Sequence, residues 1–343
     1  MTRRGSTRRR FLVSCSALGA AGLAGCTGGD DPAETDSTPT DDGGAEPTTT
    51  DGPTATETTT PERAVVETLV SVGGDRVPEN MAFGPDGGLY FGITAGEVRR
   101  VPPEETGATG LSLEDTEQIA TLPGAVGVET APDGTVYVAV PTQDDQAGVW
   151  EVPPDGEATR LVGVGGFPND IHYDAQRERL LVTESQNGVV YAVTPDGGRS
   201  TWLDDDRLDT ESFGANGITR SGGDIYVAVT RAPGETGRLL RVPVESDGAA
   251  GAAATFFEGG AVFGADGITG RGGDIYVAAN SQNRVVRVTP DGTTDTVATA
   301  DDGLVFPSDV LFGSGERADS LFICNFANQS PEDGAILRTG VPR

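Results

Sequence analysis

The sequence predicts an all-β fold, a six-bladed β-propeller with four-stranded blades, over residues 64–343. An apolar strand core recurs at intervals of 47, 44, 45, 50 and 46 residues, beginning at Leu89, Val136, Leu180, Ile225, Ile275 and Leu321. The runs between these cores are short, rich in Gly, Pro and Asp, and without helical periodicity. One such unit cannot bury its faces alone, so we expect six to pack in a ring. A β-sandwich would not explain near-identical repeats at a fixed period.

Each repeat contributes a turn, the strand core and a following strand, as in "APDGTVYV" and then "GVWEV". The apolar run Ala64–Val72 comes before the first complete repeat. We expect it to pair as the outermost strand of the last blade. That pairing would close the ring and leave no open sheet edge.

The first 63 residues predict export and anchoring rather than fold. Residues 7–12, "TRRRFL", resemble a twin-arginine motif, and the apolar run that follows is too short to span a bilayer. Residues 23–26, "LAGC", resemble a lipobox with Cys26 as the acylated residue. We therefore expect residues 1–25 to be a signal peptide and Cys26 to anchor the chain to the outer face of the cytoplasmic membrane. Residues 26–63, rich in Thr, Asp, Glu and Pro, are expected to be a disordered tether.

The charge balance excludes some partners. There are 53 acidic and 24 basic residues, a net charge of −29, and every basic residue is arginine. Such a surface repels nucleic acid and anionic lipid, so membrane contact is expected through the lipid anchor only. The lysine-free acidic composition resembles the haloarchaeal type of adaptation to high salt. Within the propeller, Cys324 is the only cysteine, which excludes an intrachain disulfide and a cysteine-based zinc site there.

One position is shared by all six repeats, at the start of the strand that precedes each core. It follows a Pro or an Ala, and an apolar residue stands two positions later. We call these six positions the slots; they hold Glu79, Val126, Asn169, Asn216, Asp266 and Ser308. In a propeller these strands run along the central channel, so the slots form a ring at one channel mouth.

The slots of the fourth and fifth repeats lie in nearly identical segments. "GANGIT" (214–219) and "GADGIT" (264–269) differ only at Asn216 and Asp266. Four slots carry a carboxylate or a carboxamide, which are the hard oxygen donors that Ca²⁺ prefers. Asn, Asp and Gly are also ordinary turn residues before a strand. We favour a site for one divalent cation formed by Glu79, Asn169, Asn216 and Asp266, with Ca²⁺ ahead of Mg²⁺, Mn²⁺ or Zn²⁺.

These motifs resemble the regucalcin/gluconolactonase (senescence marker protein-like) family, to which the paraoxonases are related. The resemblance rests on Glu79, Asn169-Asp170, "NGI" from Asn216, "DGI" from Asp266 and "VLFGSGERADSLFICN" near the C-terminus, and it covers residues 65–343. It implies a six-bladed propeller with one divalent cation in the channel, bound by Glu79, Asn216 and Asp266 with Asn169 close by. It also implies hydrolysis of a lactone or a related ester.

In such a hydrolase the cation polarises the substrate carbonyl, and Asp266 or cation-bound water would activate the attack. The substrate-pocket candidates are Phe167, Asp170, His172, Val126 and Ser308. Gluconolactonase-type members often carry an arginine where this chain has Phe167, which makes a more apolar pocket the expectation. His172 is the only histidine, and a packed or surface role competes with proton transfer in the channel.

Two other functions remain as alternatives. The propeller could be a non-catalytic, surface-anchored binder of a ligand or partner, with the cation in a structural role. A quinone-dependent dehydrogenase would be expected to show a catalytic histidine and basic channel residues, and the single histidine and the lack of lysine argue against it. In either of the favoured cases the partner is a small molecule, and a ring of six blades needs no second copy, so we expect a monomer.

Overall fold

The structure, a computed structural model, describes residues 65–341. The expected signal peptide, Cys26 and the tether lie outside the described residues. Within the described part, no helix is long and apolar enough to cross a membrane. Its helices are three-residue 3₁₀ turns: η1 (Pro103–Glu105), η2 (Leu113–Asp115), η3 (Gly260–Val262), η4 (Asn280–Gln282), η5 (Ala300–Asp302), η6 (Gly315–Arg317) and η7 (Pro331–Asp333).

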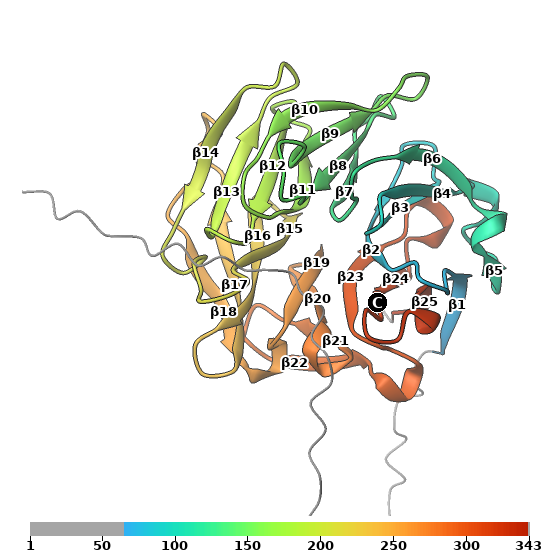
Figure 1. The fold of residues 1–343 in the computed structure, drawn as a ribbon. Coiled ribbons are helices and arrows are strands. Elements are labelled where there is room, and N and C mark those ends of the chain that lie inside the picture. The colour runs from blue at the N-terminus through green and yellow to red at the C-terminus, as the bar shows by residue number, and fades with distance from the viewer. Residues whose placement is uncertain (1–64, 342–343) are drawn as a thin grey trace, which may run out of the picture. The chain divides into compact units, whose positions relative to one another are not determined.

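The strands form six sheets in a propeller, so the predicted fold class is confirmed (Figure 1). Blade 1 contains β2 (Pro78–Phe83), β3 (Leu89–Ile93), β4 (Glu97–Val101) and β6 (Glu117–Thr121). Blade 2 contains β7 (Val128–Thr130), β8 (Val136–Val140), β9 (Gly148–Val152) and β10 (Thr159–Gly163). Blade 3 contains β11 (Pro168–Asp174), β12 (Arg179–Glu184), β13 (Val189–Val193) and β14 (Arg199–Asp204).

The second half of the ring repeats the pattern. Blade 4 contains β15 (Ala215–Ser221), β16 (Asp224–Ala232), β17 (Thr236–Pro243) and β18 (Ala254–Gly259). Blade 5 contains β19 (Ala265–Arg271), β20 (Asp274–Ala279), β21 (Arg284–Val288) and β22 (Thr294–Ala298). Blade 6 contains β23 (Pro307–Phe312), β24 (Ser320–Asn325) and β25 (Ala335–Gly340), and is completed from elsewhere in the chain.

The N-terminal strand completes blade 6, as predicted. β1 (Val66–Ser71) pairs antiparallel with β25, with Val66 opposite Thr339 and Ser71 opposite Ala335. It is not the outermost strand, however, because β5 (Leu111–Ser112) pairs parallel with its outer edge. β5 belongs to the connection between β4 and β6 of blade 1, so blade 1 covers an edge that β1 would otherwise leave open.

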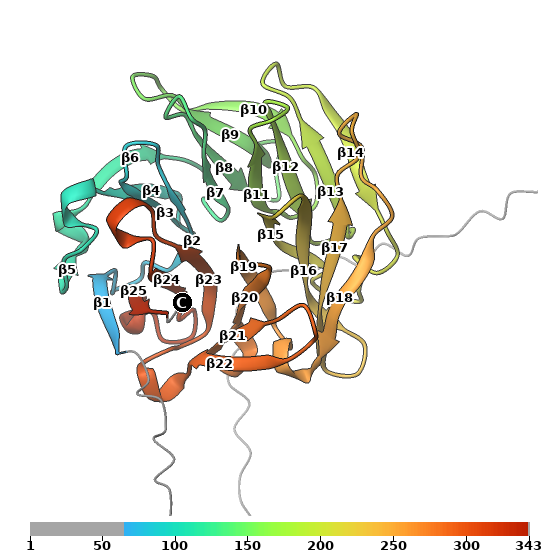
Figure 2. The same ribbon diagram turned by 180° about the vertical axis from the view of Figure 1, so that it is seen from behind.

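The six innermost strands surround the axis of the propeller. In ring order they are β2, β7, β11, β15, β19 and β23; each contacts the next, and β23 contacts β2 again. Figure 2 shows the same strands at the centre of the ring from the opposite side. The slots therefore lie on neighbouring strands all the way around the channel.

A separate apolar cluster lies between each pair of neighbouring blades. Each cluster contains one of the six apolar residues that stand two positions after a slot: Met81, Val128, Ile171, Ile218, Ile268 and Val310. These side chains are at most 5% exposed. Burying each one stabilises the fold by about 1.5–3 kcal/mol. Each slot is thus held in place by a buried apolar residue two positions later in the chain.

Candidate functional site

The backbone is irregular where the slots occur. In blades 1, 3, 4, 5 and 6, the pairing of the innermost strand with the next strand changes register across the slot, for example between Ala215 and Ile218 and between Ala265 and Ile268. Such an irregularity releases the side chain from the alternation of the strand and redirects it. In blade 2 the strand begins only at Val128, two residues after Val126.

Three slot side chains are buried and fixed by a partner that lies on the second strand of their own blade or directly after it. Asn169, Asn216 and Asp266 are 3%, 5% and 7% exposed. The amide nitrogen of Asn169 donates to Ser185 Oγ at 2.9 Å, and that of Asn216 donates to Thr230 Oγ1 at 3.0 Å. These bonds use the amide nitrogen of each side chain and leave its carbonyl oxygen for another partner.

Asp266 is held by the opposite arrangement of donor and acceptor. Its Oδ2 accepts a hydrogen bond from Asn280 Nδ2 at 2.8 Å, and the carboxylate also accepts one from Asn216. The structure therefore brings two of the predicted site residues, Asn216 and Asp266, into direct contact. Asn169 is linked to the same region because Ser185 Oγ, its acceptor, donates to the Ala215 carbonyl at 2.6 Å.

The partners Ser185, Thr230 and Asn280 were missed by the sequence argument. The signal was present, because each stands five residues after the first residue of its strand core, at Leu180, Ile225 and Ile275. Their types differ, a hydroxyl twice and an amide once. The hydroxyl or amide at each of these positions is explained only by the slot residue to which it is hydrogen-bonded.

The residues that follow the slots tie one blade to the next. Asp170 Oδ2 accepts from the backbone N–H of Ile218 at 2.8 Å, which joins blade 3 to blade 4. Asp309 Oδ2 accepts from Met81 N at 3.0 Å and joins blade 6 to blade 1. Asn80 Oδ1 accepts from Val128 N at 2.9 Å, while its Nδ2 donates to Asp170 Oδ1 at 3.1 Å.

In the other three blades the same position is glycine, because the neighbouring strand comes too close for a side chain. A Cβ on Gly127 would lie 2.1 Å from the Asn169 carbonyl oxygen, and one on Gly217 would lie 2.3 Å from that of Asp266. A Cβ on Gly267 would lie 2.1 Å from Asp309 Oδ1. The glycines of "NGI" and "DGI" are thus explained by close approach of neighbouring strands.

Four carboxyl groups share this buried region, and burial is the main cause of the rise in each pKa. The pKa of Asp266 is raised to about 7 despite its hydrogen bonds, and that of Asp170 to about 6. The pKa values of Glu79 and Asp309 are raised well above their usual range by burial and by the neighbouring carboxyls. The negative charges of Asp266, Asp309 and Asp170 all raise the pKa of Glu79, and Asp266 is the one predicted ligand among them.

This charge pattern fits a cation. No arginine contributes to the pKa shifts of the four carboxyls. Two carboxylates and two amide oxygens are a donor set of the kind that Ca²⁺ accepts. Within residues 65–341, no three His, Cys, Asp or Glu side chains form a group that could hold a metal ion by themselves. The predicted set contains only two residues of these types, Glu79 and Asp266, and depends on its asparagines.

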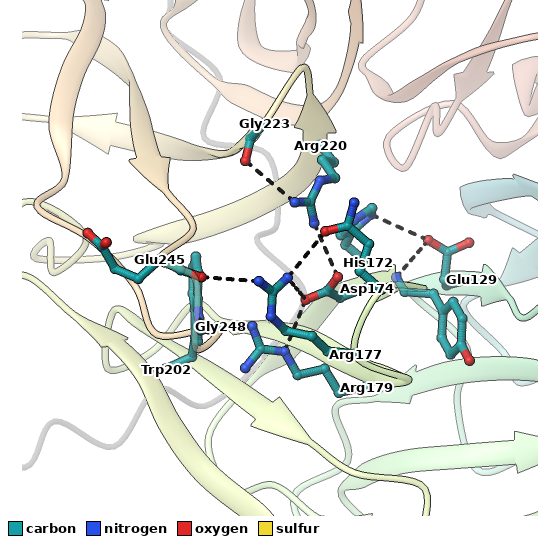
Figure 3. A network of polar contacts seen from close by, with 12 residues as sticks. Glu129, His172, Asp174, Arg177, Arg179, Trp202, Arg220, Gly223, Glu245 and Gly248 are labelled. Atoms are coloured by element: carbon teal, nitrogen blue, oxygen red, sulfur yellow. Dashed lines mark hydrogen bonds and ion pairs between the residues drawn. The ribbon is translucent and has the colours of Figure 1, made fainter.

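The remaining predicted pocket residues lie in different surroundings. Ser308 Oγ donates to the Glu79 carbonyl at 2.6 Å, and Val126 is 6% exposed within the apolar cluster between blades 2 and 3. The Phe167 ring packs edge-on against Phe213, with 5.0 Å between centroids. His172 lies further along β11, with Nδ1 3.8 Å from Glu129 Oε2 (Figure 3). Burial and Arg220 lower its pKa to about 4, so it is neutral near pH 7.

Comparison with known proteins shows the fold. A strictosidine synthase-like N-terminal family model matches residues 67–101. A comparison with curated protein sequences finds no match. A gluconolactonase from Xanthomonas campestris is similar in structure, with a TM-score of 0.61 and 18% identity over 81% of this chain and 90% of that one.

Two further solved structures extend the comparison. A calcium-binding protein, regucalcin, from Agrobacterium tumefaciens has a TM-score of 0.57 and 18% identity over 79% of this chain and 95% of that one. An auxiliary nutrient-binding protein from Bacteroides ovatus has a TM-score of 0.61 and 13% identity over 82% of this chain and 77% of that one. The structural neighbours thus include gluconolactonase and regucalcin propellers, the group that the slot motifs resemble.

Proposed function

We propose that this chain is a cation-dependent hydrolase of lactones or related esters, acting at the slot end of the channel. The observation that carries the proposal is a set of four interacting carboxyls without an arginine partner, of which Asp170, Asp266 and Asp309 are buried and Glu79 is half-buried. Beside them lie asparagines whose amide nitrogens are already bonded within the blade. The gluconolactonase and regucalcin neighbours support the same reading.

Glu79, Asn169, Asn216 and Asp266 would hold one divalent cation, for which Ca²⁺ is the first candidate. When bound, the cation withdraws electron density from the substrate carbonyl and offsets the charge that develops on its oxygen. Asn280 fixes Oδ2 of Asp266, and Ser185 and Thr230 fix the two asparagines, so the ligand positions are set before any substrate arrives.

Asp266 is the proposed general base. Water attacks the carbonyl carbon and forms the new C–O bond while its proton passes to the Asp266 carboxylate. The C–O bond to the leaving alkoxide then breaks, and that oxygen takes the proton from Asp266. A lactone yields one hydroxy acid, and an open ester yields an acid and an alcohol. His172 takes no part, because it lies beyond the slots on β11.

The substrate is proposed to be more apolar than a sugar lactone. Phenylalanines stand two or three residues before the slots of four consecutive blades: Phe167, Phe213, Phe263 and Phe306. Phe213 is 41% exposed, which is unusual for so large an apolar side chain. We expect Phe167→Arg to lower kcat/KM for aryl esters and long-chain lactones at least fivefold, with less effect on δ-gluconolactone. Parallel kinetics on both substrate types check this, and an equal loss on both would contradict it.

We further propose that the enzyme acts outside the cell as a monomer anchored through Cys26 by the predicted lipid. Replacing Cys26 by Ala should move the protein from the membrane fraction to the medium without changing its specific activity, because the propeller begins about 40 residues later. Cell fractionation and activity assays measure this. A Cys26→Ala protein that stays with the membrane would contradict the anchor.

The test of function is hydrolysis of a panel of lactones and aryl esters in high salt, with a chelator and after addition of CaCl₂. We expect turnover that the chelator removes and Ca²⁺ restores. A chelator without effect on either turnover or thermal stability would refute the cation site. If no substrate turns over while Ca²⁺ raises the Tm, the protein is instead a binder with a structural cation. The nutrient-binding neighbour from Bacteroides ovatus supports that second candidate.

A further inference from the structure

A cavity of about 190 Å³ lies in the channel beyond the slots. No slot residue lines it; every lining residue follows a slot along an innermost strand. Its side walls include one residue three positions after each slot: Ala82, Glu129, His172, Thr219, Thr269 and Leu311. We call these six residues the lower ring. The cavity therefore lies next to the slots and shares Asp170 and Asp309 with the group of four carboxyls described above, but no proposed cation ligand lines it.

The lower ring has a polar side and an apolar side. Glu129, His172, Thr219 and Thr269 come from four consecutive blades, 2 to 5. Leu311 and Ala82 come from blades 6 and 1, which are neighbours in the ring. A ligand that fills the cavity would meet a carboxylate, an imidazole and two hydroxyls on one side, and aliphatic carbon on the other.

The polar side has more acceptors than donors. Glu129 Oε1 accepts from Thr130 N at 2.8 Å and Oε2 from Tyr173 N at 3.1 Å, which leaves a second lone pair on each oxygen. His172 Nε2 is buried and has no hydrogen-bond partner among residues 65–341. An unpartnered buried nitrogen of this kind is unusual, and a bound group would satisfy it.

The cavity also lacks a positive charge of its own. Two further carboxyls, Asp170 and Asp309, line its end nearest the slots, and no arginine lines it. The nearby arginines are engaged outside the cavity. As Figure 3 shows, Arg177, Arg179 and Arg220 surround the buried Asp174 at 3.4, 3.2 and 3.2 Å. A ligand that brings both N–H donors and positive charge is the complement of this lining.

We propose that the cavity binds a small alkylammonium ion, with its ammonium group toward Glu129 and His172 and its alkyl chain against Ala82 and Leu311. The third ammonium proton is donated to the hydroxyl of Thr219 or Thr269. A volume equal to about six waters accommodates the head group and a short chain. This inference does not depend on the proposed hydrolase activity.

The test uses the full chain and n-butylammonium chloride, with binding followed by calorimetry in 2 M KCl to screen the acidic surface. We expect one saturable site, and binding of 1-butanol at least tenfold weaker. Glu129→Gln should weaken n-butylammonium binding at least tenfold. The matched control is Glu178→Gln, which changes an exposed carboxylate directly before β12 and should leave the affinity unchanged.

A second variant keeps the test valid if Glu129→Gln does not fold. Leu311→Phe should reduce the space for the alkyl chain, and therefore weaken n-butylammonium at least fivefold while leaving methylammonium unchanged. The proposal is overturned by an absence of saturable binding, or by equal affinities in the parent, Glu129→Gln and Leu311→Phe proteins. It is also overturned if Asp266→Asn, at the slots, abolishes n-butylammonium binding while Glu129→Gln does not.

Discussion

Blades 4 and 5 begin with almost the same six residues, yet their slots are held in opposite ways. In blade 4 the Asn216 amide donates to a hydroxyl, Thr230 Oγ1. In blade 5 the Asp266 carboxylate accepts from an amide, Asn280 Nδ2. The slot has changed from donor to acceptor, and its partner has changed from acceptor to donor.

This paired difference shows that each blade has a hydrogen-bond partner suited to its own slot residue. Asn280 beside an asparagine, or Thr230 beside an aspartate, would still allow a hydrogen bond, but with less complementarity. The exchange also places a charge in blade 5 that blade 4 does not have. Asn216 also donates a side-chain hydrogen bond that lowers the pKa of Asp266, so the two slots interact directly.

The largest expected effect comes from making the two slots alike. Asp266→Asn removes the proposed base and one of two anionic ligands, so we expect kcat/KM for lactone hydrolysis to fall at least about 100-fold. The fold should persist, because an asparagine can present its oxygen to Asn280 Nδ2. Steady-state kinetics and thermal unfolding measure the two effects.

The matched control changes blade 4 instead. Asn216→Asp keeps an oxygen donor at the slot and adds negative charge, so Ca²⁺ should bind at least as tightly, with less than a tenfold loss of kcat/KM. If the two substitutions reduced hydrolysis equally, the special role of Asp266 would be wrong.

The second-largest expected effect is a pH dependence of the stability of the cation-free protein, to which Asp266 of blade 5 contributes. Unfolded carboxyls have pKa values of about 4, whereas those of Asp170 and Asp266 in the fold are about 6 and about 7. The cation-free folded state therefore binds more protons than the unfolded state between these values. The stability that these two raised pKa values contribute is fully present below about pH 4 and is lost as the pH rises toward 7.

We accordingly expect the Tm in chelator to fall by several degrees between pH 5 and pH 7.5. Added CaCl₂ should restore most of it at pH 7.5, because the cation offsets the ionised carboxylates. Asp266→Asn should make the decrease in chelator shallower, whereas Asn216→Asp should make it steeper. If the Tm in chelator rose over this interval, ionisation of the carboxyls would not destabilise the cation-free fold, and the expectation would be wrong.

The ring architecture was predictable because it depends on a repeat that can be recognised in the amino-acid sequence. The apolar residues two positions after the slots, such as Ile218 and Ile268, lie in the clusters between blades as their common spacing requires. The strand β5 was not predictable, because it pairs across blades and consists of only two residues with no periodicity of their own.

The site was predictable only in part, for a similar reason. The slots are aligned by the repeat, so their positions follow from the sequence. The carboxyls of Asp170 and Asp309 act through the backbone of the next blade, at Ile218 and Met81. The first contact joins residues 48 positions apart in the chain and the second joins residues 228 positions apart. The residue types alone do not predict either contact. The four carboxyls likewise come together, three of them buried, only after the ring has closed.

The smallest expected effect is the sharpest test of the paired difference. Asn280→Ala removes a charge-assisted hydrogen bond to Asp266, and Thr230→Ala removes a neutral one from Asn216; charge-assisted bonds are roughly twice as strong. We therefore expect Asn280→Ala to weaken Ca²⁺ binding about tenfold and Thr230→Ala clearly less. Calorimetric titration of Ca²⁺ into both proteins measures this.

A double-mutant cycle separates the pairing from general damage to blade 5. The coupling in unfolding free energy between positions 266 and 280, measured with Asp266→Asn and Asn280→Ala, should exceed that between positions 216 and 230. It should also shrink as the pH falls from about 8 to about 6, because Asp266, with a pKa of about 7 in the folded state, becomes protonated and no longer offers a charged acceptor. Equal couplings that do not change with pH would mean that the exchange of partners between blades 4 and 5 carries no electrostatic advantage.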